Sequence, residues 1–587
     1  MEKKKILLGC GSTLEVLDTG AEAVLWINDY YMNRAKELCL YKEDVEQHVI
    51  PKFWQTQEEF CSAKDYSIKI YKTVITELAR QLDEMHCTHF GDKGWNVILG
   101  YWMMPYIEGF YDKYSRVKYA TVSYPDLYMK EREAWCIPKG NDLPGNEILQ
   151  AQQYQDVYRF LYYDNVNINI EERCEILPYV LPGSKRDSEK HGIQHMFVGI
   201  LKKMVCRKRV TLYLSTPYLA LSRTILELLS LGRISRLEIP NKLIPENKLS
   251  LDMRKKLKRE VEYGDEFISL IYDCLWKHIP MQFVEDFQGY YDAYKGLELK
   301  IPVKIVDSVN FCNDILFKIF VADTISRGGK LEIIQHGGNY CLDKCIAWWE
   351  FDIAYKFYTW GSGFSENNRG NLYAMPVPKT LSVKKRRNAK KILFVGYIDY
   401  PYVARFMQFF DVKIEELFKQ EEVFFQSLGE NSRELLSVRC YPNDPWWERK
   451  KVLAQMFPWM QFDYSQNFYV SMTEAKLVVT DVISTTCIEA ISCNIPTIIF
   501  SNDDFFIPDQ NAVDILNELR RVQVVFDRAE DAAEFINKNE QRIDSWWNEK
   551  ERKDVVNRFR KMYASHDCFS KLKWVKEMIK ESKTKLC

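Results

Sequence analysis

Apolar and polar positions follow two repeating patterns along this chain. Short apolar runs end at glycine or at polar turn residues, and between them lie longer stretches in which apolar residues recur three and four positions apart. The short runs are typical of buried strands, and the longer stretches are typical of amphipathic helices. Because strands that alternate with helices form parallel sheets covered on both faces, the pattern predicts an α/β protein.

The alternation is clearest in the middle of the chain. The segments VKIVDSV, KLEIIQHGG and IAYKFYTWGSG predict strands that end in turns, and NDILFKIFVADTISRGG predicts a helix that stops at a glycine pair. Upstream, the spacing predicts a helix over 44–85, a strand-like run entering a helix over 94–117, and a strand over 209–218. Near the start, KKILLGCGST and EAVLWIN predict two more extended runs.

A polar, basic segment divides the chain. VPKTLSVKKRRNAKK is followed at once by the hydrophobic run ILFVGYI, and 587 residues are too many for one ordinary core. We therefore predict a linker between two α/β domains, solvated rather than bound to anionic lipid. The predicted parts are an N-terminal domain with helical insertions at 1–380, a basic linker at 381–390, a C-terminal domain at 391–545, and helices at 546–587, for which packing back on the N-terminal domain is one option.

Composition narrows the class of function. Lys and Arg number 81 against 82 Asp and Glu, a balance that argues against a dedicated nucleic-acid binder. No apolar run reaches the roughly 18 residues of a membrane span, so we expect a cytoplasmic protein that contacts a membrane, if at all, peripherally at its inner face. The 16 cysteines are scattered and predict reduced thiols. The 35 tyrosines and 15 tryptophans suit a carbohydrate surface, although any single ring is more often core.

The segment AKLVVTDVISTTCIEAISCNIPTIIF carries the strongest signal for a ligand. A buried strand ends at a polar turn with Ser484, Thr485 and Thr486, and a helix begins there with Glu489 in its first turns. Hydroxyl groups and free backbone N–H groups at a helix start bind anions, so this turn predicts a site for nucleotide phosphates. Glu489 is expected to accept from ribose hydroxyls. The alternative is an ordinary N-cap, where serine and threonine are preferred anyway.

The residues QHGG, from Gln335 to Gly338, follow a predicted strand. The carboxyl end of a parallel strand is the edge at which open α/β sheets bind ligands. Gly337 and Gly338 would let backbone approach a substrate closely, and His336 would act as a general base or a phosphate contact.

Carboxylates lie just downstream of that histidine. Glu350 and Asp352 precede the next strand, and either is expected to orient the imidazole or to serve as the base.

Arg439 and Asp444 lie in SVRCYPNDPWW, which also follows a strand. The guanidinium offers a planar fork for phosphate or carboxylate, while the alternative is a turn built on Pro442. His191 and His195 are four apart, but no HExxH motif accompanies them, so a structural or surface role is favoured and no metal site is predicted. The chain has no P-loop, GxGxxG or GxSxG motif, which removes support for ATPase, dehydrogenase and serine-hydrolase functions.

Several segments together resemble a family. GWNVILGYWMMPYIEGFYDKY, QHGGNY, AYKFYTWGSG, RCYPND and STTCIEAISCNIPTIIF, in this order, resemble the transferases of bacterial surface-carbohydrate (O-antigen and capsule) loci. That family is similar to GT-B-type enzymes, in which two Rossmann-like domains face each other across a cleft. More distantly it is similar to capsule Kdo transferases, bacterial sialyltransferases and CDP-glycerol glycerophosphotransferases. The resemblance covers about residues 94–500.

The resemblance implies roles for these residues and also shows two departures. It implies that the C-terminal domain holds the donor nucleotide at Ser484–Thr486 and Glu489, and that the N-terminal domain holds the acceptor and the base at His336. Capsule-type relatives carry His-Pro where this chain has Tyr441-Pro442, so Arg439 is expected to take the phosphate or the donor differs. Tyr355 stands where the family has an acidic residue, which puts a catalytic carboxylate at that place in doubt.

The resulting hypothesis is a glycosyltransferase that needs neither metal nor cofactor. It would transfer a sugar from a nucleotide-activated donor, CMP-linked in the first instance, to a bacterial surface polysaccharide or a lipid-linked glycan acceptor. Protein donors can neutralise the leaving phosphate without a metal ion. One alternative is a CDP-polyol phosphotransferase, which would need more Lys and Arg around His336 than the local sequence offers. Another is a non-catalytic carbohydrate-binding protein on a degenerate transferase fold.

Overall fold

The structure is a computed structural model, and most of the chain is described in it. The described residues are 6–10, 21–40, 43–130, 135–140, 146–162, 174–177, 209–237, 239, 247–258, 264–346, 348–364, 370–381, 383, 389–442 and 444–583. His191 and His195 lie outside these residues, as does most of the predicted linker.

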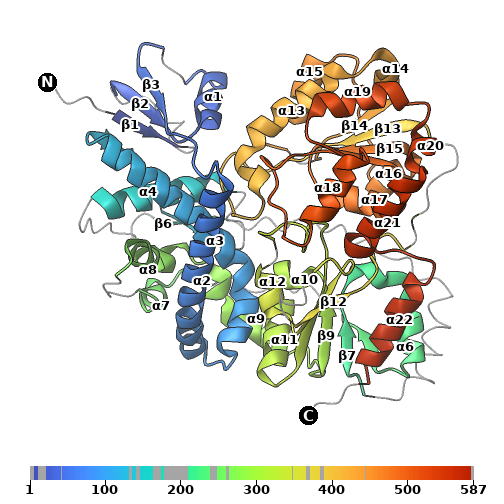
Figure 1. Cartoon of the computed structure of the whole chain (residues 1–587). Coiled ribbons are helices and arrows are strands. Elements are labelled where there is room, and N and C mark those ends of the chain that lie inside the picture. The colour runs from blue at the N-terminus through green and yellow to red at the C-terminus, as the bar shows by residue number, and fades with distance from the viewer. Residues whose placement is uncertain are drawn as a thin grey trace.

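A six-stranded parallel sheet forms the centre of the N-terminal half (Figure 1). Its strand order is β12-β11-β10-β9-β7-β8. The strands are β7 (Leu212–Leu214), β8 (Ile234–Arg236), β9 (Lys304–Asp307), β10 (Lys330–Ile334), β11 (Lys356–Thr359) and β12 (Leu372–Ala374). The helices among them are η4 (Pro217–Ser222), α6 (Arg223–Leu229), α7 (Leu251–Lys255), α8 (Glu266–His278), η5 (Met281–Phe283), α9 (Phe287–Lys295), α10 (Asn310–Asn313), α11 (Ile315–Ser326) and α12 (Trp348–Ile353).

A second parallel sheet of five strands forms the C-terminal domain, with the order β14-β13-β15-β16-β17. Its strands are β13 (Lys391–Val395), β14 (Leu436–Arg439), β15 (Ala475–Thr480), β16 (Thr497–Phe500) and β17 (Val525–Phe526). Its helices are η6 (Phe409–Lys413), α13 (Ile414–Ser427), α14 (Glu430–Leu435), α15 (Arg449–Met456), α16 (Phe468–Glu474), α17 (Thr485–Ser492), α18 (Val513–Arg521), α19 (Ala529–Asn539), α20 (Ile543–Trp547) and α21 (Lys550–Tyr563). The two sheets confirm the predicted α/β fold with two Rossmann-like domains.

The first part of the chain adds a third parallel sheet, which the sequence pattern did not predict as a separate unit. Its order is β3-β2-β1-β4, and α1 (Asp29–Glu37) follows the second strand. The strands are β1 (Ile6–Gly9), β2 (Ala23–Trp26), β3 (Glu46–Val49) and β4 (Leu127–Tyr128). A short pair, β5 (Trp135–Pro138) and β6 (Cys174–Leu177), and α4 (Glu147–Tyr162) follow in the chain.

Two long helices, α2 (Gln57–His86) and α3 (Gly91–Ser123), connect the first sheet to the six-stranded sheet (Figure 1). The predicted strand-like start of 94–117 is wrong, because α3 runs through Pro105 without a break. Its side chains are buried on nearly all faces, since α3 packs against α2, α4 and α11. A helix that is apolar all round has no helical periodicity to read, so it imitates a buried strand.

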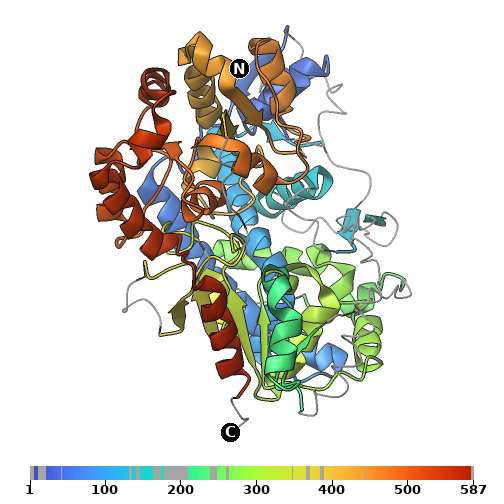
Figure 2. The ribbon, with the colours of Figure 1, turned by 90° about the vertical axis from the view of Figure 1, so that its right-hand side faces the viewer.

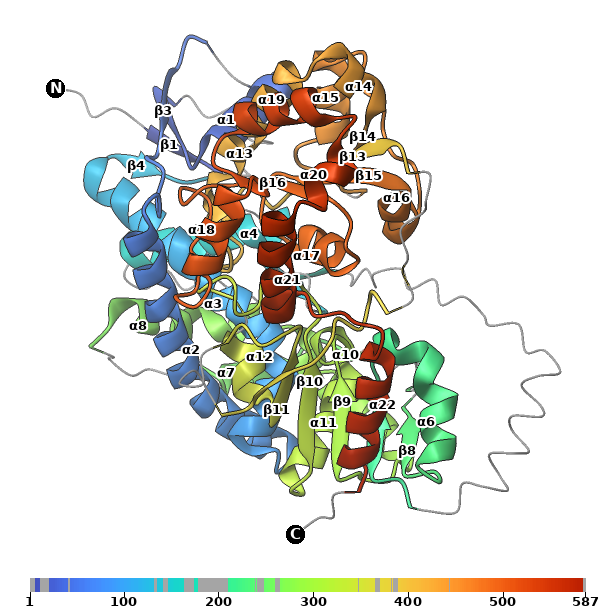
Figure 3. The ribbon, with the colours of Figure 1, turned by 45° about the vertical axis from the view of Figure 1, so that its right-hand side comes forward.

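The last helix, α22 (Ser570–Glu581), leaves the C-terminal domain and packs beside the six-stranded sheet (Figures 2 and 3). Trp574 and Met578 join the apolar cluster that contains Leu212 and Tyr358. Glu581 forms ion pairs with Lys304 of β9 and Lys356 of β11. The C-terminal helix therefore ties one domain to the other. None of the helices in the described part of the chain has the length and apolar content of a membrane span.

Candidate active site

The loop after β10 touches the start of α17 directly. The backbone N–H of Gly338 donates to Oγ1 of Thr485 at 2.9 Å, and Nδ2 of Asn339 donates to the carbonyl of Ile483 at 2.6 Å. A Cβ atom on Gly338 would lie 2.7 Å from the Thr485 Cα, so only glycine permits this approach. The QHGG loop and the hydroxyl turn therefore meet at one junction between the two domains, and the close approach of Gly338 is to the other domain.

Gln335 fixes the shape of this loop. Its Nε2 donates to the carbonyl of Gly337 at 2.6 Å, and its Oε1 accepts from the backbone N–H of Trp360 at 2.7 Å. The indole N–H of Trp360 donates to the Gln335 carbonyl at 2.9 Å. Because Gln335 is buried and uses its amide on protein groups, it positions the loop.

His336 is connected to Glu350 through Tyr340. The Tyr340 hydroxyl donates to Oε1 of Glu350 at 2.9 Å and lies 3.2 Å from Nδ1 of His336. A tyrosine that gives its proton to a carboxylate accepts from the imidazole N–H, so the chain of contacts orients the ring. Burial, together with the positive charges of Lys379 and Arg405, lowers the pKa of His336 to about 4. The imidazole is therefore neutral at neutral pH and can accept a proton.

Two cations that the sequence did not single out act electrostatically on this histidine. Nζ of Lys379 lies 3.4 Å from Oε1 of Glu489, and Nε of Arg405 lies 3.8 Å from Oε2 of Glu108. Lys379 lies in the segment VPKTLSVKKRRNAKK, just before the predicted linker at 381–390, and nothing in that segment distinguishes it from its neighbours. Arg405 follows β13 in the C-terminal domain, and only the fold brings it to the histidine of the other domain.

The start of α17 has the features of an anion site and also those of an ordinary cap. Ser484 is the N-cap, and its backbone N–H donates to Sγ of Cys487 at 3.2 Å. Thr485 is committed to Gly338, while Thr486 is partly exposed. Glu489 is buried and hydrogen-bonded to Tyr469, and burial raises its pKa. The carboxylate is thus held inside the junction beside Lys379.

The remaining predicted residues have other partners. Nη1 of Arg439 donates to the carbonyl of Ser465 at 2.9 Å and forms an ion pair with Asp463. Asp444 accepts from the backbone N–H groups of Trp447 and Arg449, both at 2.8 Å, and so caps the start of α15.

Asp352 is directed toward the long helices. Its Oδ2 lies 3.6 Å from Nζ of Lys72 on α2, so its ion pair links α12 to that helix. Within the described ranges, no three His, Cys, Asp or Glu side chains gather as a metal site.

Comparisons with known proteins were made for sequence family, curated sequences and solved structures. The family model described as LIC12162 family transferase matches residues 10–578. No curated protein sequence matches this chain.

The following solved structures show some similarity to this chain, each with low overall superposition. MurG of Acinetobacter baumannii gives a TM-score of 0.28 at 10% identity, covering 50% of this chain and 78% of that one. The calicheamicin glycosyltransferase CalG4 gives a TM-score of 0.29 at 11% sequence identity, and the match covers 67% of this chain and 96% of CalG4. A UDP-glucose:anthocyanidin 3-O-glucosyltransferase in complex with UDP gives a TM-score of 0.29 at 11% sequence identity, and the match covers 66% of this chain and 96% of that one. The family match spans nearly the whole chain, and the protein belongs to the LIC12162 family of transferases.

Proposed function

We propose that the protein is a GT-B-type glycosyltransferase whose reaction takes place at the junction of the two domains. The observation that carries the proposal is the neutral His336, which is oriented through Tyr340 toward Glu350 and experiences the positive charges of Lys379 and Arg405. A base, an orienting group and two cations beside a helix start make up the apparatus that sugar transfer from a nucleotide requires.

In the proposed reaction, an acceptor hydroxyl gives its proton to His336 and attacks the anomeric carbon of the donor. The new C–O bond forms as the bond from the anomeric carbon to the phosphate oxygen breaks, and the nucleotide leaves with that electron pair. Lys379, Arg405 and the N-terminus of α17, with Thr486, neutralise the charge on the leaving phosphate. Glu489 is assigned to the nucleotide ribose. The donor is proposed to be CMP-linked, and the acceptor a bacterial surface polysaccharide or a lipid-linked glycan.

One observation favours a second candidate, a CDP-polyol phosphotransferase. Phosphoryl transfer needs several positive charges around the reacting phosphate, and the fold supplies two beside His336 that the local sequence lacks. In that reaction the acceptor hydroxyl would attack the outer phosphorus of the donor, and CMP would leave. The acceptor would then gain a new phosphodiester, which ³¹P NMR detects, whereas sugar transfer from a CMP-linked donor would add no phosphorus to the acceptor.

Two measurements test the proposal. Thermal unfolding with CMP, CDP, UDP and GDP compounds should show stabilisation by at least one nucleotide, and no shift with any of them contradicts both enzymes. His336→Ala should keep that shift and lose turnover at least about 100-fold, since general-base catalysis contributes that much. His48→Ala is the matched control, because His48 pairs with Glu46 on β3 at 3.1 Å, in the first sheet. If His336→Ala turns over as fast as the wild type, His336 is not the general base.

A further inference from the structure

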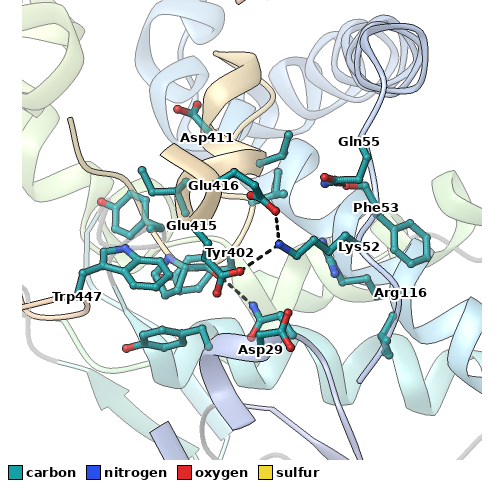
Figure 4. Close-up of a pocket in the computed structure, with 18 of the residues that line it drawn as sticks. Asp29, Lys52, Phe53, Gln55, Arg116, Tyr402, Asp411, Glu415, Glu416 and Trp447 are labelled. Atoms are coloured by element: carbon teal, nitrogen blue, oxygen red, sulfur yellow. Dashed lines mark hydrogen bonds and ion pairs between the residues drawn. The ribbon is translucent and has the colours of Figure 1, made fainter. Parts of the chain in front are cut away.

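A cavity lies where the first sheet, the long helices and the C-terminal domain meet (Figure 4). About 640 Å³ of space free of protein atoms lies here, a volume that includes open solvent. One wall comes from α1 and the loop after β3, another from α3 and α4, and a third from residues 400–416 with Trp447. These segments are far apart in sequence, and the cavity exists only because the fold joins them.

Aromatic rings form much of its lining. They are Tyr30, Phe53, Tyr154, Tyr400, Tyr402 and Trp447. The Trp447 ring packs edge-on against Tyr30 with centroids 5.0 Å apart, and its indole N–H donates to the carbonyl of Asp399 at 2.8 Å. The rings of Tyr400 and Tyr402 are stacked at 5.5 Å. Rigid aromatic faces present flat apolar surfaces, which match the C–H faces of a sugar ring.

Two polar atoms of the lining have no hydrogen-bond partner in the described protein. The hydroxyl of Tyr154 is one, although only 1% of this side chain is exposed. The other is Oε2 of Glu416, which is also buried. A buried polar group without a partner costs about 1–3 kcal/mol, so both atoms favour a ligand that brings hydroxyl or amine groups.

The charge of the lining excludes an anionic ligand. Glu415 and Glu416 share a single cation, Lys52, whose Nζ lies 3.1 Å and 2.5 Å from them; Figure 4 shows it directed between the two carboxylates. Arg116 is committed to Asp112, which its Nε reaches at 2.9 Å. Asp29 adds a further carboxylate, whereas burial and the neighbouring Asp399 raise the pKa of Asp411 well above its ordinary value, so Asp411 is left out of this charge balance. Phosphates, uronic acids and sialic acids would meet net repulsion here, whereas neutral and amine-bearing sugars would not.

The cavity is close to the proposed reaction centre. Tyr402 lines the cavity, and Arg405, three residues later, acts electrostatically on His336 and Glu350. Three residues span at most about 11 Å of chain. A glycan with one ring in the cavity would therefore have its next units near the junction.

We infer that this cavity binds one neutral or amine-bearing sugar ring of the acceptor glycan, held between the aromatic walls and hydrogen-bonded to Tyr154 and Glu416. The inference rests on the proposed function, because that function assigns the anionic donor to the cationic junction. The anionic, aromatic cavity is then assigned to the acceptor.

The test measures binding of methyl glycosides of galactose, N-acetylglucosamine, glucosamine and glucuronic acid to the full chain. Saturation-transfer NMR detects the binding, and titration calorimetry gives the dissociation constants. The first three are expected to bind and the glucuronide to bind at least about 10-fold more weakly. Tyr154→Phe is expected to weaken binding about 5- to 10-fold while leaving the melting temperature unchanged or higher, since its hydroxyl has no partner to lose.

Tyr158→Phe, one turn further along α4, is the matched control. Its hydroxyl donates to the carbonyl of Leu127 at 2.8 Å, so this variant should lose stability and keep sugar binding. Equal binding by Tyr154→Phe and the wild type, preference for the glucuronide, or no binding of any glycoside overturns the inference. The nucleotide shift and the His336→Ala turnover do not depend on this cavity, so the proposed function stands or falls separately.

Discussion

Replacing Gly338 by alanine should separate the two domains at the junction. A Cβ atom at this position would lie 2.7 Å from Cα and 2.9 Å from N of Thr485, and 2.9 Å from Cγ1 of Ile488. Two of these three atoms are backbone of α17, which cannot rotate away as the end of a side chain can. The helix or the loop must therefore move, and the hydrogen bond from Gly338 N–H to Thr485 Oγ1 is lost with that movement.

The magnitude follows from those two effects. Forcing an extra methyl group into a packed contact costs about 1–3 kcal/mol. Losing one hydrogen bond costs about 0.5–1.5 kcal/mol. We expect Gly338→Ala to weaken the contact between the domains by about 2–4 kcal/mol. If the junction is the reaction centre, turnover should also fall by about 30- to 1,000-fold, since about 1.4 kcal/mol corresponds to a factor of ten.

Gly337→Ala is the control. A Cβ atom there would lie 3.4 Å from both Oγ1 of Thr485 and Cε2 of Tyr340, which is ordinary van der Waals contact. Thermal unfolding by calorimetry, limited proteolysis and turnover should place Gly337→Ala near the wild type and Gly338→Ala well below it. Equal behaviour of the two variants would refute the argument that the Gly338 contact requires the absence of a side chain.

Three further predictions concern charged groups. Asp83→Asn should destabilise the protein by roughly 1–2 kcal/mol at pH 7. Asp83 accepts hydrogen bonds from Thr88, Trp95, Gly91 and Phe90, which lower its pKa although burial opposes them. The difference between the two proteins in urea unfolding should therefore shrink as the pH falls below the ordinary aspartate value, and a constant difference would contradict this. Glu581→Gln should loosen α22 and cost about 1–3 kcal/mol in the same assay, because burial opposes ionisation but hydrogen bonds from Lys304 and Lys356 lower its pKa to about 2. Its effect should persist down to about pH 3, whereas an effect lost by pH 5 would show that the ion pairs contribute nothing. Lys379→Met should raise the pKa of His336, because it removes one of the two charges that lower it. NMR titration of the imidazole ring measures this pKa, and an unchanged titration curve would show that Lys379 has no electrostatic effect on the histidine.

The sequence predicted the elements whose patterns are local. The strands from β9 to β11 and from β13 to β16 each show a short apolar run that ends in a turn, and the carboxyl ends of two of them carry His336 and Ser484–Thr486. Both segments lie at the carboxyl ends of parallel strands, where open α/β sheets bind ligands, so their place at one site could be predicted. The helix α3 was partly missed because it is apolar on all sides, so its pattern has no helical period.

The cations of the junction could not be predicted in the same way. Lys379 and Arg405 come from a basic run and from a loop that have no strand-end pattern, and only the packing of the domains brings their charge to His336. Conversely, Arg439 and Asp444 were expected at a ligand because of their residue types and loop position. In the structure, Arg439 is bonded to Asp463 and Asp444 caps α15. Residue type and strand-end position indicate where a site can form, but the long-range charge partners decide which side chains remain for a ligand.

The low pKa of His336 has a consequence for the proposed reaction. A base with a pKa of about 4 removes a proton from a sugar hydroxyl inefficiently. Burial is the largest cause of that low value, and the charges of Lys379 and Arg405 are the others. A donor phosphate bound between these two cations would offset their effect and add negative charge beside the ring, so the pKa of His336 would rise. On the proposed function, the histidine becomes an effective base only once the donor is in place, which would protect a site without donor from unproductive deprotonation.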